Sequence, residues 1–323
     1  MEFIKPKIEL YRTRTFSDKL TDTFDFLRET WKPLLKYFVY LMLPCCIVLG
    51  FFLNHFYSGY MQLIMAGENT GATSRADVVQ MLVFMGLTFV TLIVSYSLLL
   101  ALIFAIVRLY RQRDDRLKLL TDDELKDELK VCLRRSARLM LASMGIFFGV
   151  LLVIGGAAVA LSMASIGLGI VFILSIVFTL AAIALPLSLV SPIYMLEDDI
   201  TVIGAFQRAF HLGFPTWGGI FAVSFVIGIL TGVVQTVTSG PWYVLYIVKM
   251  VFTLSHELDG SFTNNIFYTF AEYITCVLEC LGILISTVIT NVALTMQYGH
   301  AADKIDGVGV AQKIQHFDEL DKF

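Results

Sequence analysis

Charged residues are scarce in this sequence. Lys, Arg, Asp and Glu together make up 16% of its 323 residues, whereas a soluble globular chain has about 25%. Hydrophobic residues make up 57%, and the mean hydropathy is +0.75. So few charges cannot cover the surface of a compact soluble fold, and disorder requires low hydrophobicity and high charge. The composition therefore predicts an integral membrane protein.

Other features are also missing. The net charge is -3, so no basic excess indicates nucleic-acid binding. None of the five cysteines lies in a segment that we expect outside the cell, so no extracellular disulfide framework is predicted. About 33 polar or amphipathic residues precede the first apolar run, which is unlike a secretory signal peptide. We therefore expect that run to be a membrane helix.

Long apolar runs define the expected architecture. A spanning helix needs about 20 mostly apolar residues, and six runs meet this length. We predict an all-α integral membrane protein with a six-span domain over 34–298. It follows an amphipathic N-terminal segment (1–33) and precedes a tail (299–323). The expected spans are 34–56, 79–109, 139–163, 166–196, 217–237 and 268–298.

A seventh apolar stretch, 242–254, is shorter. At 1.5 Å per residue it covers about 20 Å, less than the roughly 30 Å hydrocarbon core. It also contains Lys249, and its Trp242, Tyr243 and Tyr246 suit the headgroup region. We expect an interfacial or re-entrant segment here.

Basic residues predict the orientation. All but two of the 24 Lys and Arg residues lie before the first span or after the second, fourth and sixth spans, when Lys36 and Arg108 at the edges of the first and second spans are counted with these segments. The exceptions are Arg75 and Lys249. Because basic residues favour the cytoplasmic side, we predict that both termini are cytoplasmic.

An amphipathic segment precedes each pair of spans. Thr15 with Asp18, and Thr121 with Glu124, have capping-box spacing. Thr201 begins a third segment, which Gly213 is placed to end. We therefore predict three repeats of an amphipathic cytoplasmic helix and a transmembrane hairpin, although any multi-pass protein can carry such helices. In the first segment, apolar residues recur at intervals of 4, 3 and 4, which defines one helix face: Leu20, Phe24, Leu27 and Trp31.

Small residues line faces of two expected spans, where they would let helix backbones approach closely. We expect these faces to pack helices within the chain, with contacts between subunits as the alternative. They are Gly145, Gly149, Gly156 and Ala160 in the third span, and Gly228 and Gly232 in the fifth.

Polar residues in the last two spans form the first candidate site. A carboxylate at the bilayer centre costs about 3 kcal/mol, so such residues face the bundle interior and have partners. Glu279 lies within the sixth span, and we expect Gln235 or Thr231 to be its partner. The seam is either a path for an ion, a proton or a lipid headgroup, or hydrogen-bonded packing. It comprises Glu279, Glu272, Ser286, Thr290, Gln235 and Thr231.

Arginines flanking the second and third spans form the second candidate site. Clusters near the membrane surface bind anionic headgroups at about 1 kcal/mol per residue, although topology alone also places basic residues there. The candidate headgroup contacts are Arg108, Arg111, Arg134, Arg135 and Arg138.

A loose pattern at the end of the fourth span resembles a known group. An apolar span ends in Pro192 and a short acidic turn, followed by the segment 204–210 (GAFQRAF) and Trp217. The second span ends in Arg108, Leu109 and Tyr110. This pattern is similar to the bacterial membrane domain attached to some glycerophosphodiester phosphodiesterases. The resemblance implies the bacterial inner membrane and no phosphodiesterase activity, because the catalytic barrel of that group is a separate domain. It implies no functional residue.

No catalytic or metal-binding motif is present. The five histidines do not pair at metal-ligand spacing, and no phosphate-binding or nucleophile motif occurs. We therefore expect no enzymatic activity, no cofactor and no nucleic-acid partner. The expected role is structural or interaction-based, with the bilayer, anionic lipids or a membrane protein as partner. The alternatives are a transporter or lipid-handling protein that uses the Glu279 seam, and an intramembrane enzyme.

Overall fold

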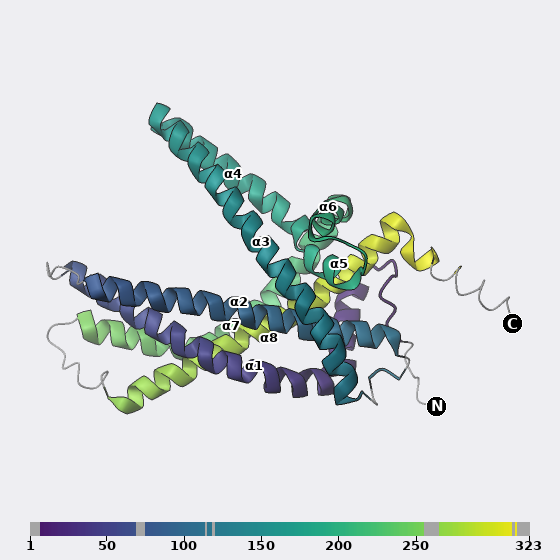
Figure 1. Cartoon of the computed structure of the whole chain (residues 1–323), viewed down its shortest axis with the longest axis horizontal. Helices are drawn as coiled ribbons and strands as arrows, with labels where there is room; N and C mark the ends of the chain where they lie inside the picture. Colours follow the sequence, from purple (N-terminus) through teal and green to yellow (C-terminus); the bar gives the residue numbers. More distant parts are fainter. Residues whose placement is uncertain are drawn as a thin grey trace. The chain divides into compact units, whose positions relative to one another are not determined.

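The computed structural model describes residues 7–68, 75–113, 115–117, 120–254, 265–311 and 314. This part of the chain is helical and contains no strand (Figure 1). The helices are α1 (Phe16–Glu68), α2 (Arg75–Gln112), α3 (Asp122–Ala164), α4 (Ile166–Leu187), α5 (Val190–Leu196), α6 (Val202–Gly213), α7 (Trp217–Leu254) and α8 (Ile266–Asp306).

Six helical segments among the described residues are long and apolar enough to cross a membrane. They correspond to α1, α2, α3, α4 with α5, α7 and α8. The predicted all-α, six-span architecture is therefore confirmed. Several helices extend well beyond the expected spans. For example, α1 has 53 residues, or about 80 Å of helix. Residues 315–323 of the expected tail lie outside the described part of the chain.

The fifth span is longer than predicted. α7 has 38 residues and continues through Pro241 to Leu254. The stretch 242–254 is therefore the end of this helix and not a re-entrant segment separate from the fifth span, whereas its interfacial position stays a prediction. Taken alone, the stretch 242–254 is about 20 Å long, but the whole of α7 is about 57 Å long at 1.5 Å per residue.

The fourth expected span is divided into α4 and α5. The break falls at Ser188 and Leu189, between Pro186 and Pro192. Pro192 has no backbone N–H and so cannot bond to the carbonyl four residues earlier, which removes one helical bond at the break. The end of α6 packs against this site. A Cβ on Gly213 would lie 2.7 Å from the Pro186 Cα, so only glycine permits this close approach.

The helix starts follow the predicted capping. Thr15 N–H donates to the Asp18 carboxylate (3.1 Å), and Thr121 N–H donates to the Glu124 carboxylate (3.2 Å). The Thr201 hydroxyl accepts from Gly204 N–H (3.1 Å) at the start of α6. The first two amphipathic segments continue without a break into the apolar parts of α1 and α3, and the third forms α6 as a helix of its own. The element order thus fits the predicted alternation of amphipathic segments and hairpins.

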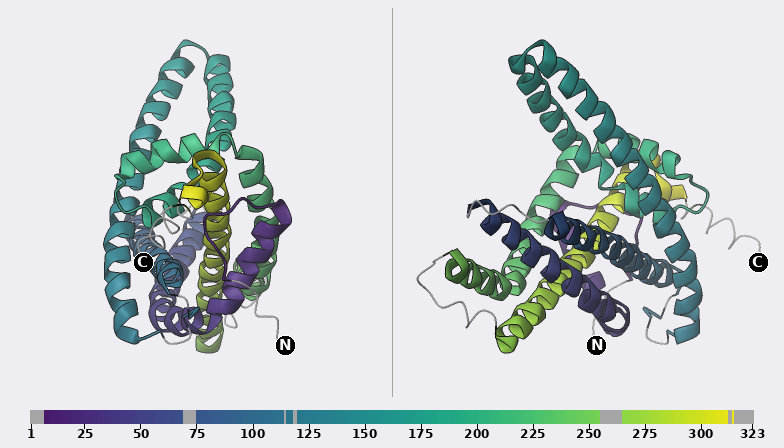
Figure 2. Two further views of the ribbon diagram at one scale, coloured as in Figure 1. Left: turned by 90° about the vertical axis from the view of Figure 1, so that its right-hand side faces the viewer. Right: turned by 60° about the vertical axis from the view of Figure 1, so that its left-hand side comes forward.

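The chain divides into two compact units. The first unit is Met1–Pro33, Leu100–Ile227 and Thr290–Phe323, and the second unit is Leu34–Leu99 and Gly228–Ile289. Within the first unit, α3 and α4 lie side by side as a hairpin (Figures 1 and 2), and α6 packs against α4 and α5. The core of the first unit includes Leu102, Ile103, Phe104, Val292 and Ala301. The core of the second includes Met42, Cys46, Trp242, Cys276 and Cys280.

The α3–α4 hairpin is largely exposed. Between residues 141 and 185, Gly169 alone is buried. It lies where the two helices approach, because a Cβ on Gly169 would be 3.0 Å from the Ser162 Cβ. The rest of this apolar surface is exposed or half-buried among the described residues.

The small-residue faces do not pack as predicted. A Cβ added at Gly145, Gly149 or Gly156 would meet no atom within 4 Å, and the same holds for Gly228 and Gly232. Our expectation that they pack helices within the chain is therefore not met in the structure. Close helix packing occurs at other glycines. Gly282 of α8 lies against Thr238 of α7, and Gly50 of α1 lies against Val277 of α8.

Candidate functional site

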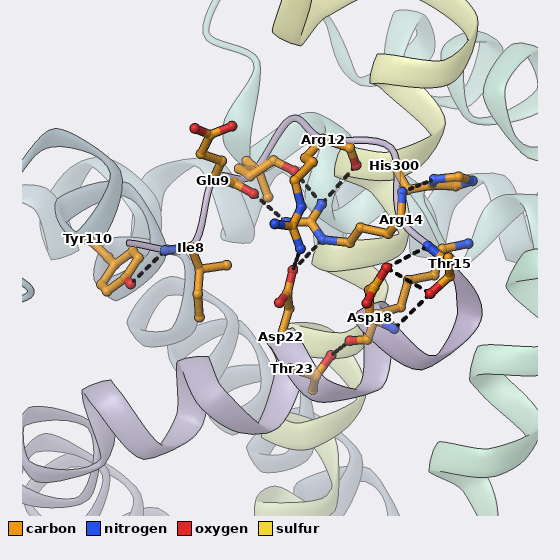
Figure 3. Close-up of polar contacts among 12 residues, drawn as sticks. Ile8, Glu9, Arg12, Arg14, Thr15, Asp18, Asp22, Thr23, Tyr110 and His300 are labelled. Atoms are coloured by element: carbon orange, nitrogen blue, oxygen red, sulfur yellow. Dashed lines mark hydrogen bonds and ion pairs between the residues drawn. The ribbon is translucent and has the colours of Figure 1, made fainter. Parts of the chain in front are cut away.

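A first network of polar contacts in the first unit is centred on the segment before α1 (Figure 3). The Arg14 side chain is fully buried and donates to the Asp22 carboxylate at 2.6 Å and to the Leu10 carbonyl at 2.8 Å. It also donates to the carbonyls of Glu9 and Arg12. Arg14 therefore folds residues 9–12 back onto the first turns of α1.

The same segment is fixed to α8. The Arg14 N–H donates to His300 Nδ1 at 2.9 Å (Figure 3), and the Tyr11 and Tyr298 hydroxyls are hydrogen-bonded at 3.3 Å. A Cβ on Gly299 would collide with the Leu10 carbonyl, so the backbone of this segment lies directly on α8. Burial lowers the pKa of Arg14, whereas the hydrogen bond and charge of Asp22 act in the opposite direction. A guanidinium nevertheless remains charged in proteins.

The first turns of α1 present their polar face to the protein interior. Lys19, Thr23, Phe26 and Thr30 are buried at intervals of 4, 3 and 4, which is one helix face. The predicted apolar face points outward instead, with Phe24 43% exposed and the other members exposed or half-buried. Because apolar residues on an outward face suit the membrane interface, this placement agrees with the predicted interfacial segment.

A second ionic cluster joins α2, α3 and the turn after α5. Arg108 contacts Glu128 at 2.5 Å and Asp198 at 2.7 Å. Arg135 contacts Asp198 at 3.1 Å and donates to the Tyr194 and Glu197 carbonyls. Both guanidinium groups therefore have contacts within the chain, although neither Nε atom makes a hydrogen bond among the described residues.

A third cluster joins α6 and α8. Arg208 contacts Glu197 at 2.5 Å and Asp306 at 2.9 Å, and the Tyr298 hydroxyl donates to Glu197 at 2.7 Å. Burial opposes the charge of Arg208, but its hydrogen bond to Glu197 and the charges of Glu197 and Asp306 outweigh that effect and raise its pKa. This cluster fixes α6 to the end of α8.

The predicted headgroup arginines fall into two groups. Arg108 and Arg135 are held in the internal cluster described above. Arg134 and Arg138 are exposed and form no ion pair in the described part of the chain. Arg111 is also exposed, and its guanidinium lies 5.2 Å from the centre of the Tyr11 ring. Headgroup contact is thus best supported geometrically at Arg134 and Arg138.

The polar seam of the second unit is partly assembled. The Ser286 hydroxyl donates to the Thr231 carbonyl at 3.4 Å, so α7 and α8 meet on the predicted faces. Glu272 is buried and pairs with Lys249 at 2.7 Å. Gln235 is exposed, and Thr290 belongs to the first unit. The seam is therefore a Ser286–Thr231 contact and a Glu272–Lys249 ion pair, with Gln235 outside it.

Glu279 has no hydrogen-bond or ion-pair partner among the described residues. It is 8% exposed, its Oε2 atom makes no hydrogen bond within the described residues, and neither Gln235 nor Thr231 bonds to it. In the same unit, the buried Asn54 Oδ1 and Trp242 Nε1 also lack partners among these residues.

Tyr57 lies near two of these residues, Trp242 and Glu279. Its ring centre lies 4.5 Å from that of Trp242, and Glu279 lies within electrostatic range of its hydroxyl. Asn54 precedes Tyr57 by one turn of α1. Buried polar groups are normally hydrogen-bonded to protein or water, so these unpartnered atoms are groups to which a water molecule would bond. We call Asn54, Tyr57, Trp242 and Glu279 the Glu279 cluster.

Sequence reasoning did not find the Arg14 contacts or the Lys249–Glu272 pair. A signal was present for α1, because Lys19, Thr23 and Thr30 have the same helical spacing as the apolar face. No comparable signal links Arg14 to His300 or Lys249 to Glu272, because their contacts depend on tertiary packing.

The described residues contain no group of three His, Cys, Asp or Glu side chains placed to hold a metal ion. The cysteines carry free thiols. Comparison with models of protein families, with curated proteins and with solved structures found no match. The resemblance to the phosphodiesterase membrane domain therefore stays a prediction.

Proposed function

We propose that this chain is a multi-pass protein of the bacterial inner membrane that holds lipid or a membrane protein partner and does not act as an enzyme. The α3–α4 hairpin carries this proposal. Its apolar surface is exposed along residues 141–185, and among the described residues no atom lies within 4 Å of a Cβ added at Gly145, Gly149 or Gly156. Such a face allows close packing with another helix in lipid.

The start of α1 supports the same function. Its apolar face points outward while its polar face is buried, which is the arrangement of a segment that contacts the bilayer surface. The exposed Arg134 and Arg138 add basic groups that suit anionic lipid. The distribution of basic residues places both termini in the cytoplasm in this proposal.

Site-specific photocrosslinking in living cells tests the proposal. A benzoylphenylalanine replacing Phe147, which is 61% exposed on α3, should give discrete adducts with a membrane protein or with lipid. The same probe replacing the fully buried Phe104 should give none.

Gly149→Leu separates a protein partner from bulk lipid. The added side chain meets no atom of this chain, so the free energy of unfolding should hold within about 0.5 kcal/mol. A protein adduct at position 147 should fall, because the small-residue face is blocked. Absence of any adduct at Phe147, or identical adducts at Phe147 and Phe104, would contradict the proposal.

The Glu279 cluster favours a second candidate function, transport or lipid handling. Three buried polar atoms in one unit, Asn54 Oδ1, Trp242 Nε1 and Glu279 Oε2, have no partner in the described part of the chain. Buried carboxylates in membrane segments commonly mark ion or proton paths. This function requires that water or a solute reaches the cluster.

Proton flux in proteoliposomes under an imposed pH gradient tests this second candidate. Glu279→Gln should abolish the flux, because the amide cannot exchange a proton. Glu124→Gln, which changes an exposed carboxylate at the start of α3, is the matched control. Equal flux in the wild type, Glu279→Gln and protein-free vesicles would rule out a proton path.

A further inference from the structure

The first turn of α7 has backbone donors without acceptors. The N–H groups of Trp217 and Ile220 bond to carbonyls of the preceding turn. No acceptor is found in the described residues for the N–H groups of Gly218 and Gly219. Thr216 precedes the helix, but its hydroxyl donates back to the end of α6 and does not cap α7. The positive end of the α7 dipole is therefore left open.

Two polar side chains lie against this turn. A Cβ on Gly219 would lie 3.3 Å from Lys19 Nζ and 3.2 Å from Gln297 Nε2. Because glycine has no Cβ, both groups can lie against the α7 backbone. Gly218 is exposed and Gly219 is half-buried, so the turn can be reached from the surface of the first unit.

Neither side chain has a hydrogen-bond or ion-pair partner among the described residues. Gln297 is fully buried, and in the described part of the chain neither its Nε2 nor its Oε1 makes a hydrogen bond. Lys19 is 5% exposed, and its ammonium group forms no hydrogen bond or ion pair with any described residue. The charged groups that act on it, Lys304 and Arg14, are both cationic. Burying such groups without partners is unfavourable.

We propose that Lys19, Gln297 and the first turn of α7 form a binding site for a phosphate group. The ammonium, the amide N–H and the helix N-terminal N–H groups are three kinds of donor, and phosphate oxygens accept from all of them. A negative charge there would also offset the local excess of cations. The phosphate belongs to a phospholipid headgroup or to a free phosphate. The site shares no residue with the hairpin surface or the Glu279 cluster, so the outcome of its test does not depend on the functions proposed above.

Titration of the purified, delipidated full-length chain tests the site. The two probes are inorganic phosphate and phosphatidylglycerol in mixed micelles, with heat of binding as the readout. Lys19→Met and Gln297→Leu should each weaken binding by about tenfold to hundredfold, which is the contribution of one charge-assisted hydrogen bond. Lys130→Met, at a side chain that is 77% exposed, should not change the affinity.

Two neighbouring glycines provide a matched pair. Gly219→Ala would place a methyl group against Lys19 and Gln297, whereas a Cβ on Gly218 meets nothing within 4 Å. Gly219→Ala should therefore weaken phosphate binding, and Gly218→Ala should not. Lys19→Met removes an unpartnered charge, so without phosphate its unfolding temperature should equal or exceed that of the wild type.

The two probes separate the two sources. Saturable binding of inorganic phosphate that competes with phosphatidylglycerol indicates a free-phosphate site, and binding of phosphatidylglycerol alone indicates a headgroup site. Both outcomes support the proposal when Lys19→Met weakens the binding by the expected tenfold or more. The proposal is overturned if the wild type binds neither probe more tightly than Lys19→Met does, or if Lys130→Met weakens binding equally.

Discussion

The two units of this chain differ in how their buried polar groups are paired. In the first unit, the buried or half-buried arginines 14, 108, 135 and 208 each contact a carboxylate, and Arg14 and Arg135 also donate to several backbone carbonyls. In the second unit, the ion pair seen among described residues is Lys249–Glu272, and the buried Asn54, Trp242 and Glu279 have atoms without partners.

The difference follows from charge density and burial. A buried charge is tolerated when a partner and further hydrogen bonds surround it, and the first unit has enough carboxylates and turns to supply them. The second unit is built mostly from apolar helix segments and has few groups to offer. Its orphaned atoms, and in the first unit the Lys19–Gln297 pair and the Nε atom of Arg135, are therefore the places where a water molecule or ligand would contribute most.

Arg14 gives the sharpest test of the first unit. Arg14→Met should lower the free energy of unfolding by about 3–5 kcal/mol, because it leaves Asp22 and several carbonyls without a buried donor. Arg12 contacts the same Asp22 oxygen at 3.1 Å, but its side chain is 47% exposed. Arg12→Met should therefore cost at most about 1 kcal/mol. Chemical unfolding in detergent would measure the free energy of unfolding of both variants. Equal losses would contradict the conclusion that the buried Arg14, and not Arg12, holds this segment in place.

The Lys249–Glu272 pair is the corresponding test of the second unit. Glu272→Gln leaves the Lys249 ammonium beside a neutral amide. Because Lys249 is 21% exposed and keeps some solvation, we expect a loss of about 2–3 kcal/mol, below the range for a fully buried pair. Lys249→Met together with Glu272→Leu should restore much of the loss. A double-mutant cycle of Lys249→Met, Glu272→Leu and the two together measures this coupling, and additive losses would show that the pair does not interact in the membrane.

The sequence was a good guide to features with local causes. Helix length, apolar runs and capping depend on neighbouring residues, so the six spans and the starts at Thr15, Thr121 and Thr201 were predicted correctly. The Ser286–Thr231 contact was also anticipated, because polar stripes on two successive spans tend to face each other.

Other features could not be read from the sequence. Pairing of Arg14 with His300, or of Gly282 with Thr238, joins residues whose proximity is created by packing. The glycines at 145, 149 and 156 are regularly spaced along one helix face, but helices pack closely at Gly50 and Gly282 instead. A small residue permits close approach but does not specify which helix will approach.

The smallest expected effect concerns the exposed arginines of α3. Arg134→Gln and Arg138→Gln should each reduce the preference for anionic over zwitterionic lipid by about 1 kcal/mol, or roughly fivefold, with less effect at high salt. Energy transfer from a label on the chain to fluorescent phosphatidylglycerol in vesicles measures this preference. Arg135→Gln is the control, because Arg135 bonds internally to Asp198 and two carbonyls. It should lower stability and leave the lipid preference unchanged, because its guanidinium is not free to meet a headgroup. If all three variants lost lipid preference equally, net charge alone would govern lipid contact, and the distinction between internal and outward arginines would not hold.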